Sequence, residues 1–275
     1  MPTSMKVELY TDINSPAIQS QYLTSTYIFT KLIPADYTVR FYAPAGWEFS
    51  SPSTQNSFVD LPATVVSGQQ AVPTPENVGL FQRITLKGDL WHDKNNDGLN
   101  NDVEPMSGVN ITLAGPTPKP TTSFNGSYVL SDLKPGAYNL LFARIGYNVT
   151  NLSSPVVTNL VSGNSPVIID AGFYKAPTIS GYVWQDEKTA DGARGADEVA
   201  ISNITVELYS TTGLSGTTTT DSNGDYTFNI ASPGDYHLKF IPNSFVFSPL
   251  QNDNKANSSG KTLTITVQSG DNETG

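Results

Sequence analysis

Residues 125–142 read NGSYVLSDLKPGAYNLLF, and this stretch decides the fold class. In its second half, Tyr138, Leu140 and Phe142 alternate with other residues, and a side-chain period of two is typical of a strand that buries one face. An Asn-Gly pair and a Pro-Gly pair precede the two runs, and both pairs favour turns. The stretch therefore predicts two half-buried strands, each following a tight turn.

The same pattern occurs three times along the chain. A V-E-L or I-T-L strand, an aromatic strand and a proline turn follow one another in each copy. The spacings are 101 and 98 residues for both landmarks, which are Tyr27, Tyr128 and Tyr226, and Pro34, Pro135 and Pro233. No sustained helical period is present. We therefore predict an all-β fold of tandem antiparallel β-sandwich modules, with these tyrosines, and Tyr37, Tyr138 and Tyr236, buried at equivalent positions.

The copies predict the domain boundaries. The second and third copies open with a strand ending in GDLW (residues 88–91) or GYVW (residues 181–184), whereas the first copy has no equivalent before Val7. The first two copies close with VGLF (residues 78–81) and AGFY (residues 171–174), and the third does not. We predict modules at 1–82, 83–176 and 177–275, with the first N-terminally incomplete and the chain part of a longer array. Short joints near 83 and 176 indicate a stiff, monomeric rod.

Composition excludes several classes of protein. The 275 residues have 37% hydrophobic and 10% aromatic content, enough for folded cores. With 15 Lys and Arg against 25 Asp and Glu, the net charge of -10 argues against nucleic-acid binding and favours cations as partners. The absence of Cys excludes disulfides, thiolate metal sites and cysteine nucleophiles. No apolar run is long enough to insert in a membrane.

The strongest chemical motif is an Asp-rich loop at residues 93–104, DKNNDGLNNDVE. It fits D-x-[DN]-x-[DN]-G-x5-E, a spacing that supplies hard oxygen ligands for Ca²⁺, with glycine at the sharp turn. The alternative is an ordinary Asn/Asp-rich turn. Strand patterns on both sides of the loop argue against an EF-hand with flanking helices. The predicted ligand set is Asp93, Asn95, Asp97, the Leu99 carbonyl, Asn101 and Glu104.

The third module has a degenerate copy of this loop at residues 186–198. The interval of six residues from glycine to glutamate is the same in both loops, but one residue is inserted before Asp191, and Lys188 replaces the third ligand. Arg194 adds a second positive charge. If this loop binds Ca²⁺, the predicted ligands are Asp186, Asp191 and Glu198.

The order of these motifs carries a resemblance to a known family. G-x-x-W, the Asp-rich loop, VNITL (residues 109–113), NGSYVL (residues 125–130) and LKPGAYNL (residues 133–140) together resemble the B-type repeats of serine-aspartate repeat surface adhesins. These repeats are related to the prealbumin-like B domains of collagen adhesins. The resemblance implies an extracellular or cell-surface location in a larger secreted protein, and an EF-hand-like calcium loop placed on a sheet. Asparagine-rich arrays of the colossin type are a further possibility.

The sequence does not favour an enzyme. Its two histidines, His92 and His237, have no Ser nucleophile with an orienting group beside them, and we expect both to be surface residues. Two functions remain open. One is a structural stalk stiffened by Ca²⁺; the other is a carbohydrate- or protein-binding module in adhesion, with a matrix component, host protein or glycan as partner.

The Asp-rich loop also leads to a mechanical prediction. The strand before the loop leaves the boundary at residue 83, so we expect Ca²⁺ to stiffen the joint between the first and second modules more than the joint near 176.

Overall fold

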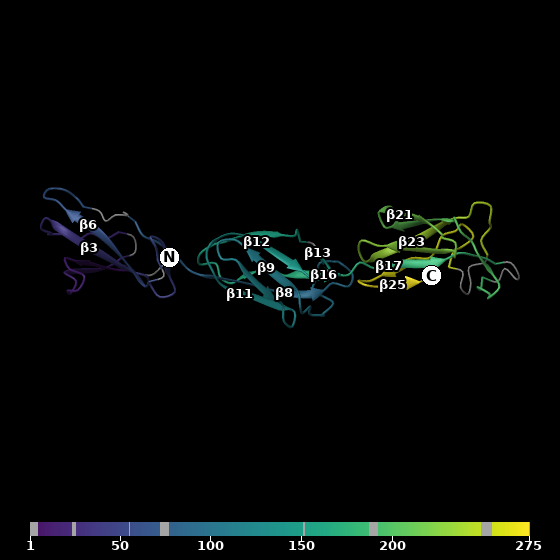
Figure 1. Ribbon diagram of the computed structural model, residues 1–275, viewed down its shortest axis with the longest axis horizontal. Helices are drawn as coiled ribbons and strands as arrows, with labels where there is room; N and C mark the ends of the chain where they lie inside the picture. Colours follow the sequence, from purple (N-terminus) through teal and green to yellow (C-terminus); the bar gives the residue numbers. More distant parts are fainter. Residues whose placement is uncertain are drawn as a thin grey trace.

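The computed structural model describes residues 5–23, 26–54, 56–71, 77–150, 152–186, 192–248 and 255–274. These residues form strands and turns, and no segment of them is helical, which confirms the all-β prediction. A helix of the length and hydropathy needed to cross a membrane is accordingly absent from the described ranges. Three groups of strands lie in a row, and the molecule is elongated (Figure 1).

The first group packs two antiparallel sheets around one hydrophobic cluster that includes Val7, Val39 and Phe41. The larger sheet has the order β2-β1-β3-β6, and the smaller one has the order β5-β4-β7. The strands are β1 (Met5–Tyr10), β2 (Gln19–Leu23), β3 (Ala35–Tyr42), β4 (Glu48–Ser51), β5 (Ser53–Thr54), β6 (Phe58–Val65) and β7 (Gly79–Phe81).

The second group has the largest of the three hydrophobic clusters, and one of its sheets contains both parallel and antiparallel strands. One sheet has the order β10-β9-β12-β14; the other has the order β11-β8-β16-β13, with β15 also on β8. β15 and β16 run parallel to β8, whereas the other pairs are antiparallel. The strands are β8 (Ile84–His92), β9 (Asn110–Ala114), β10 (Lys119–Thr122), β11 (Ser127–Leu133), β12 (Gly136–Ala143), β13 (Asn148–Thr150), β14 (Val156–Leu160), β15 (Val167–Ile168) and β16 (Ala171–Tyr174).

The third group repeats this plan with fewer paired residues. Its sheets have the orders β21-β20-β23-β24, β22-β17-β25 and β18-β19. The strands are β17 (Thr178–Tyr182), β18 (Trp184–Gln185), β19 (Val199–Ala200), β20 (Thr205–Ser210), β21 (Gly213–Thr219), β22 (Asp225–Asn229), β23 (Gly234–Ile241), β24 (Ile265–Val267) and β25 (Asn272–Thr274). We refer to the three groups as the first, second and third modules; their exact boundaries remain a prediction.

A repeated tyrosine contact confirms part of the predicted register. Tyr37, Tyr138 and Tyr236 are 5%, 1% and 8% exposed. Each hydroxyl donates a 2.9 Å hydrogen bond to the backbone carbonyl four residues earlier, on Ile33, Lys134 and Ser232 respectively. A buried ring whose hydroxyl is hydrogen-bonded keeps its apolar contacts without leaving a polar atom unpaired. This corner therefore ties each proline turn to the strand that follows it.

The second set of tyrosines is only partly as predicted. Tyr128 and Tyr226 are buried, but Tyr27 is half-buried, so the prediction for the first module is wrong. Tyr128 packs on Gly88 of β8, where any Cβ would overlap the ring, and its hydroxyl donates to the Ile169 carbonyl at 2.8 Å. The described residues of the first module include no strand equivalent to β8 to cover Tyr27.

Candidate functional site

The Asp-rich loop (residues 93–104) begins where β8 ends. The β8 ladder extends to His92, which pairs with Phe173 of β16. The next backbone amide, of Asp93, donates to the Phe173 carbonyl at 2.8 Å. At the other end of the loop, the His92 amide donates to the Glu104 carbonyl at 2.8 Å, which brings the two ends together. The loop is thus held on a sheet, as predicted.

Asp93 is the buried centre of the loop. Its side chain is 0% exposed, and its two carboxylate oxygens accept the backbone amides of Asp97 at 3.1 Å and Gly98 at 2.9 Å. Gly98 has a φ of 79°, in the left-handed region that glycine adopts without strain. Among the described residues, no Lys, Arg or His forms an ion pair with Asp93. A buried carboxylate without a cationic partner is costly, and this site therefore suits a bound cation.

Asp97 accepts hydrogen bonds from several polar groups of the turn. Its carboxylate accepts the Leu99 amide at 2.8 Å and the side-chain amides of Asn95 and Asn101, both at 2.9 Å. These hydrogen bonds, with that of Leu99 first, lower the pKa of Asp97 below its usual value. The structure thus brings together four predicted ligand residues, Asp93, Asn95, Asp97 and Asn101.

Glu104, the predicted bidentate ligand, forms ion pairs with Lys94 and His92. Its carboxylate lies 3.0 Å from Lys94 Nζ and 3.3 Å from His92 Nδ1. The hydrogen bond from Lys94 lowers the pKa of Glu104 and raises that of Lys94. In the described part of the chain, no group of three or more acidic or histidine side chains is arranged to hold a metal ion. The ligand set therefore remains a proposal, and it requires Glu104 to exchange Lys94 for the cation.

The loop of the third module keeps one contact of the second. Asp186 accepts the Gly192 amide at 2.9 Å, the distance at which Asp93 accepts Gly98. Glu198 instead accepts the Gly195 amide at 2.7 Å, three residues earlier. Arg194 lies over the Tyr182 ring, 3.8 Å from its centroid. The predicted ligand Asp191 and the substituted position Lys188 lie outside the described residues.

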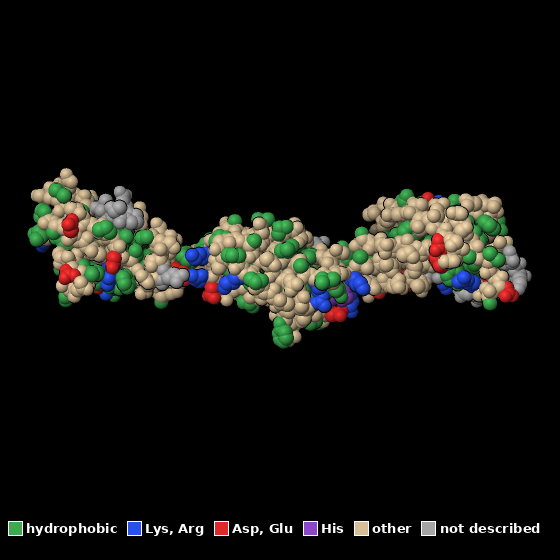
Figure 2. Space-filling view, in the orientation of Figure 1, with side chains coloured by type: hydrophobic (Ala, Val, Ile, Leu, Met, Phe, Trp, Pro, Cys, Tyr) green, Lys and Arg blue, Asp and Glu red, His purple; other side chains and the backbone are tan. Residues whose placement is uncertain are grey.

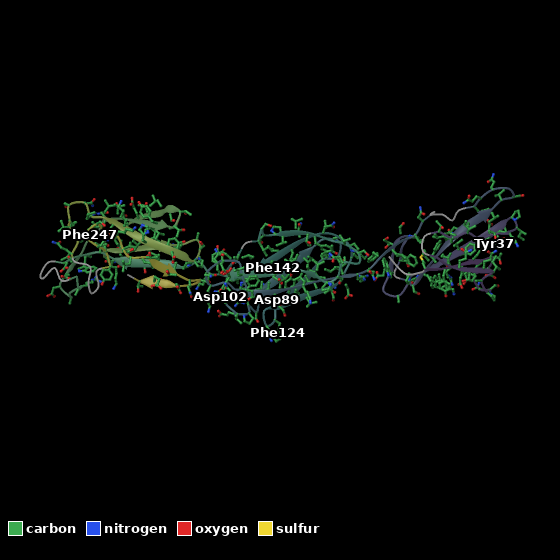
Figure 3. All side chains as sticks on the ribbon, turned by 180° about the vertical axis from the view of Figure 1, so that it is seen from behind. Tyr37, Asp89, Asp102, Phe124, Phe142 and Phe247 are labelled. Carbon is green, nitrogen blue, oxygen red and sulfur yellow. The ribbon has the colours of Figure 1, made fainter. Side chains whose placement is uncertain are left out.

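The Asp-rich loop lies at the joint to the third module, so the prediction that it acts on the first joint is wrong. The Ser269 amide donates to the Lys94 carbonyl at 2.7 Å, and His92 Nε2 lies 2.7 Å from Ser269 Oγ. Figure 3 shows Asp102 between these two modules. The reason is the length of β8: nine extended residues span about 30 Å and carry the chain to the opposite end of the module.

Both joints contain charged groups, but the contacts between the modules differ from one joint to the other. At the first joint, Arg83 binds Glu48 through Nε at 2.5 Å and donates to the Asp132 carbonyl at 2.7 Å. Charged side chains gather beside both narrow parts of the molecule (Figure 2). Sequence reasoning missed His92 and Ser269 as joint residues. His92 is half-buried by the next module, and only its place beside the loop hinted at a role.

A comparison with known families identifies the third module. Residues 177–274 match the family model described as the SdrD B-like domain. Over these residues, the third module is similar to SdrD B-like domains. The resemblance inferred from the motifs is therefore confirmed, and the motif order of the SdrD B-like domain recurs in the second module.

Two relatives align with most of the chain. Serine-aspartate repeat-containing protein F of Staphylococcus epidermidis is 32% identical over 273 residues, which cover 88% of this chain and 16% of that protein. Serine-aspartate repeat-containing protein D of Staphylococcus aureus is 31% identical over 278 residues, which cover 90% of this chain and 21% of that protein. The chain thus spans about a fifth or less of the length of these relatives.

Among solved structures, BcpA, the major pilin subunit of Bacillus cereus, matches 98% of this chain and 91% of its own, with 12% identity and a TM-score of 0.32.

Proposed function

We propose that this chain is a non-enzymatic stalk segment of a cell-surface adhesin-like protein, and that Ca²⁺ stiffens it at the joint between the second and third modules. The similarity to serine-aspartate repeat proteins supports the stalk and its surface location. The elongated row of modules supports a spacer (Figure 1). The whole parent protein's partners are not part of this proposal.

One observation carries the calcium part of the proposal. Asp93 is completely buried, and its carboxylate accepts hydrogen bonds from the backbone amides of Asp97 and Gly98. Asp93, Asn95, Asp97, the Leu99 carbonyl, Asn101 and Glu104 would hold the ion. Bound Ca²⁺ would supply the positive charge that offsets the acidic loop. The chain's own part is to present hard oxygens on a turn anchored to β8 and β16.

The link to stiffness is the contact between loop and third module. Lys94 presents its carbonyl to the Ser269 amide, while its side chain binds Glu104. His92 touches both Glu104 and Ser269. Whatever orders the loop therefore also orders the groups that contact the third module. No such contact reaches the first joint from the loop among the described residues.

Paired spin labels test this proposal, because the chain has no native Cys. Val157 and Leu214 are exposed at 73% and 57%, and Tyr22 at 73%. Val157→Cys with Leu214→Cys spans the second joint; Tyr22→Cys with Val157→Cys spans the first and is the matched control. Pulsed electron resonance measures each distance distribution in Ca²⁺ and in chelator.

We expect Ca²⁺ to narrow the distribution across the second joint and to leave the first unchanged. No narrowing at the second joint would overturn the calcium-stiffened stalk. An equal narrowing at both joints would place the effect elsewhere than in the loop.

A further inference from the structure

Two buried polar groups of the second module lie near the base of the Asp-rich loop and have no hydrogen-bond partner. They are the indole Nε1 of Trp91 and the hydroxyl Oγ1 of Thr150. Trp91 is 7% exposed, and Thr150 is 3% exposed. A buried polar group without a partner lowers the stability of a fold, so two such groups in one place call for a common explanation.

The strand register places both groups on the same face of one sheet. Gly172 of β16 pairs with Trp91 of β8 on one side and with Thr150 of β13 on the other. Paired residues of neighbouring strands lie on the same face of a sheet. Ala171 and Phe173, the chain neighbours of Gly172, belong to the hydrophobic core. Trp91, Gly172 and Thr150 therefore lie on the opposite face, away from the core.

Gly172 lets the indole of Trp91 reach from β8 towards β13. A Cβ at Gly172 would lie 3.0 Å from both Nε1 and Cε2 of Trp91, closer than side-chain carbons usually approach. The edge of the ring that carries the N–H group thus lies over the glycine, and Thr150 is the next residue across the sheet. The indole and the hydroxyl still form no direct hydrogen bond with each other. A molecule that joins them must be small and polar.

The chemistry of the site selects water. The indole N–H group only donates, so it does not bind a cation. The buried carboxyl group of Asp93 disfavours an anion, because Asp93 Cβ lies 3.1 Å from the position that a Cβ of Gly172 would take. The low exposure of Trp91 and Thr150 excludes larger molecules. Water accepts the indole hydrogen and also bonds to a hydroxyl, and buried water has about two to four such partners.

We propose that the second module holds one internal water molecule between Trp91 Nε1 and Thr150 Oγ1. The water accepts the indole hydrogen and donates to the Thr150 hydroxyl. It joins β13 to the end of β8, where the Asp-rich loop begins, and so fixes the base of the loop without a metal ion. Neither side chain belongs to the predicted calcium ligands, so this proposal and the calcium-stiffened stalk stand or fail separately.

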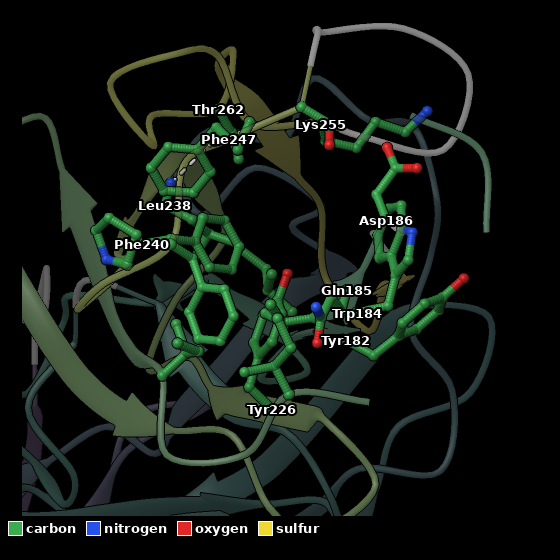
Figure 4. A pocket seen from close by; sticks show the side chains of 18 of the residues that line it. Tyr182, Trp184, Gln185, Asp186, Tyr226, Leu238, Phe240, Phe247, Lys255 and Thr262 are labelled. Carbon is green, nitrogen blue, oxygen red and sulfur yellow. Dashed lines mark hydrogen bonds between the residues drawn. The ribbon is translucent and has the colours of Figure 1, made fainter. Parts of the chain in front are cut away.

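The third module has the same donor in a more open place. Trp184 occupies the position of Trp91, and its Nε1 also has no hydrogen-bond partner. Trp184 is half-buried and lines a cavity of about 730 Å³ together with Tyr182 and Asp186 (Figure 4). We expect water in such a space to exchange rapidly with solvent. Trp184 is therefore the internal comparison for Trp91.

Nuclear magnetic resonance of the whole chain in chelator tests the site. The three Trp residues give three indole N–H signals, and Trp91→Phe assigns that of Trp91. We expect a cross-peak between the Trp91 indole hydrogen and a water molecule that exchanges slowly with solvent, and rapid exchange at Trp184. Thr150→Val should remove the cross-peak, whereas Thr150→Ser, which keeps the hydroxyl, should retain it. Absence of the cross-peak in the wild-type chain, or its persistence in Thr150→Val, would overturn the internal water.

The sign of a stability change gives a second measurement, because valine has nearly the shape of threonine. Removing an unpaired hydroxyl raises the melting temperature of the second module. Removing a hydroxyl that binds the water leaves the water and the indole short of a partner, and we expect Thr150→Val to lower the melting temperature by about 4 to 8 °C. Thr112→Val, at an exposed position of β9, is the matched control for the strand preference of valine. A melting temperature of Thr150→Val at or above that of Thr112→Val is incompatible with the proposal.

Discussion

The second and third modules share one plan and differ at the end of their first strand. In the second, β16 closes the sheet beside β8, and Phe173 is 0% exposed. In the third, the equivalent first strand, β17, pairs with β25 along Thr178, Ile179 and Ser180. The acidic loop follows that strand in both modules, yet only the second keeps the full pattern D-x-N-x-D-G. In the second module β16 also anchors the loop, because the Asp93 amide donates to the Phe173 carbonyl at 2.8 Å.

The largest expected effect comes from opening the second module. Phe173→Ala removes a fully buried ring from the core of the second module. We expect a loss of about 3 to 5 kcal/mol in the unfolding free energy. Phe247→Ala, at a partly buried ring packed against the core of the third module, should cost less than half as much. Guanidinium denaturation of each variant measures both values. Similar losses would show that the two modules are equally packed at this end.

A smaller effect is expected from adding a methyl group to the equivalent glycines. A Cβ on Gly88 would overlap the Ile169 carbonyl, which is backbone and cannot move freely. A Cβ on Gly181 would overlap the hydroxyl end of the Tyr226 side chain, which can shift more easily. We expect Gly88→Ala to cost about 2 to 3 kcal/mol and Gly181→Ala about 1 kcal/mol. Thermal unfolding followed by calorimetry compares them. The reverse order would show that the backbone contact of Gly88 does not set the cost of the added methyl group.

Ca²⁺ should stabilise the module with the Asp-rich loop and have little effect on the module with the degenerate loop. At 100 times the dissociation constant, a ligand adds about 2.7 kcal/mol to the unfolding free energy of the module that binds it. We expect this gain in the second module, and we expect Glu104→Gln to remove most of it, whereas Glu198→Gln should change little. Melting temperatures with Ca²⁺ and with chelator provide the measurement. If the wild-type melting temperature is the same in Ca²⁺ and in chelator, neither loop contains a calcium site.

The smallest expected effect is at the contact between these modules. Ser269→Ala removes the oxygen that lies 2.7 Å from His92 Nε2 and accepts the Lys175 amide at 2.6 Å. The loss in unfolding free energy should stay near 1 kcal/mol, while the spin-label distances across the second joint should broaden. Ser162→Ala, which removes an acceptor of the Gln82 amide at the first joint, is the matched control. Broadening with Ser162→Ala alone would contradict the role of Ser269.

Local pattern determined much of this fold in advance. Alternation of the kind seen in β12 places Tyr138, Leu140 and Phe142 inside, because successive side chains of a strand point to opposite faces. The repeated spacing predicted three copies, and motif order predicted the family. The contact of each proline-turn tyrosine with a carbonyl four residues away is local too, so it recurs in all three modules.

Three features depended on contacts between distant segments, and only the tertiary structure decided them. Tyr27 is half-buried because its cover in the other modules comes from another strand. Glu104 turns to Lys94 and His92, although its spacing fits a ligand of Asp93. The Asp-rich loop contacts Ser269, far away in the sequence, through the Lys94 carbonyl, because an extended strand carries its two ends to opposite ends of a module. A sequence pattern specifies which face of a strand is buried, whereas the neighbour that buries it is set by how strands far apart in the chain pair.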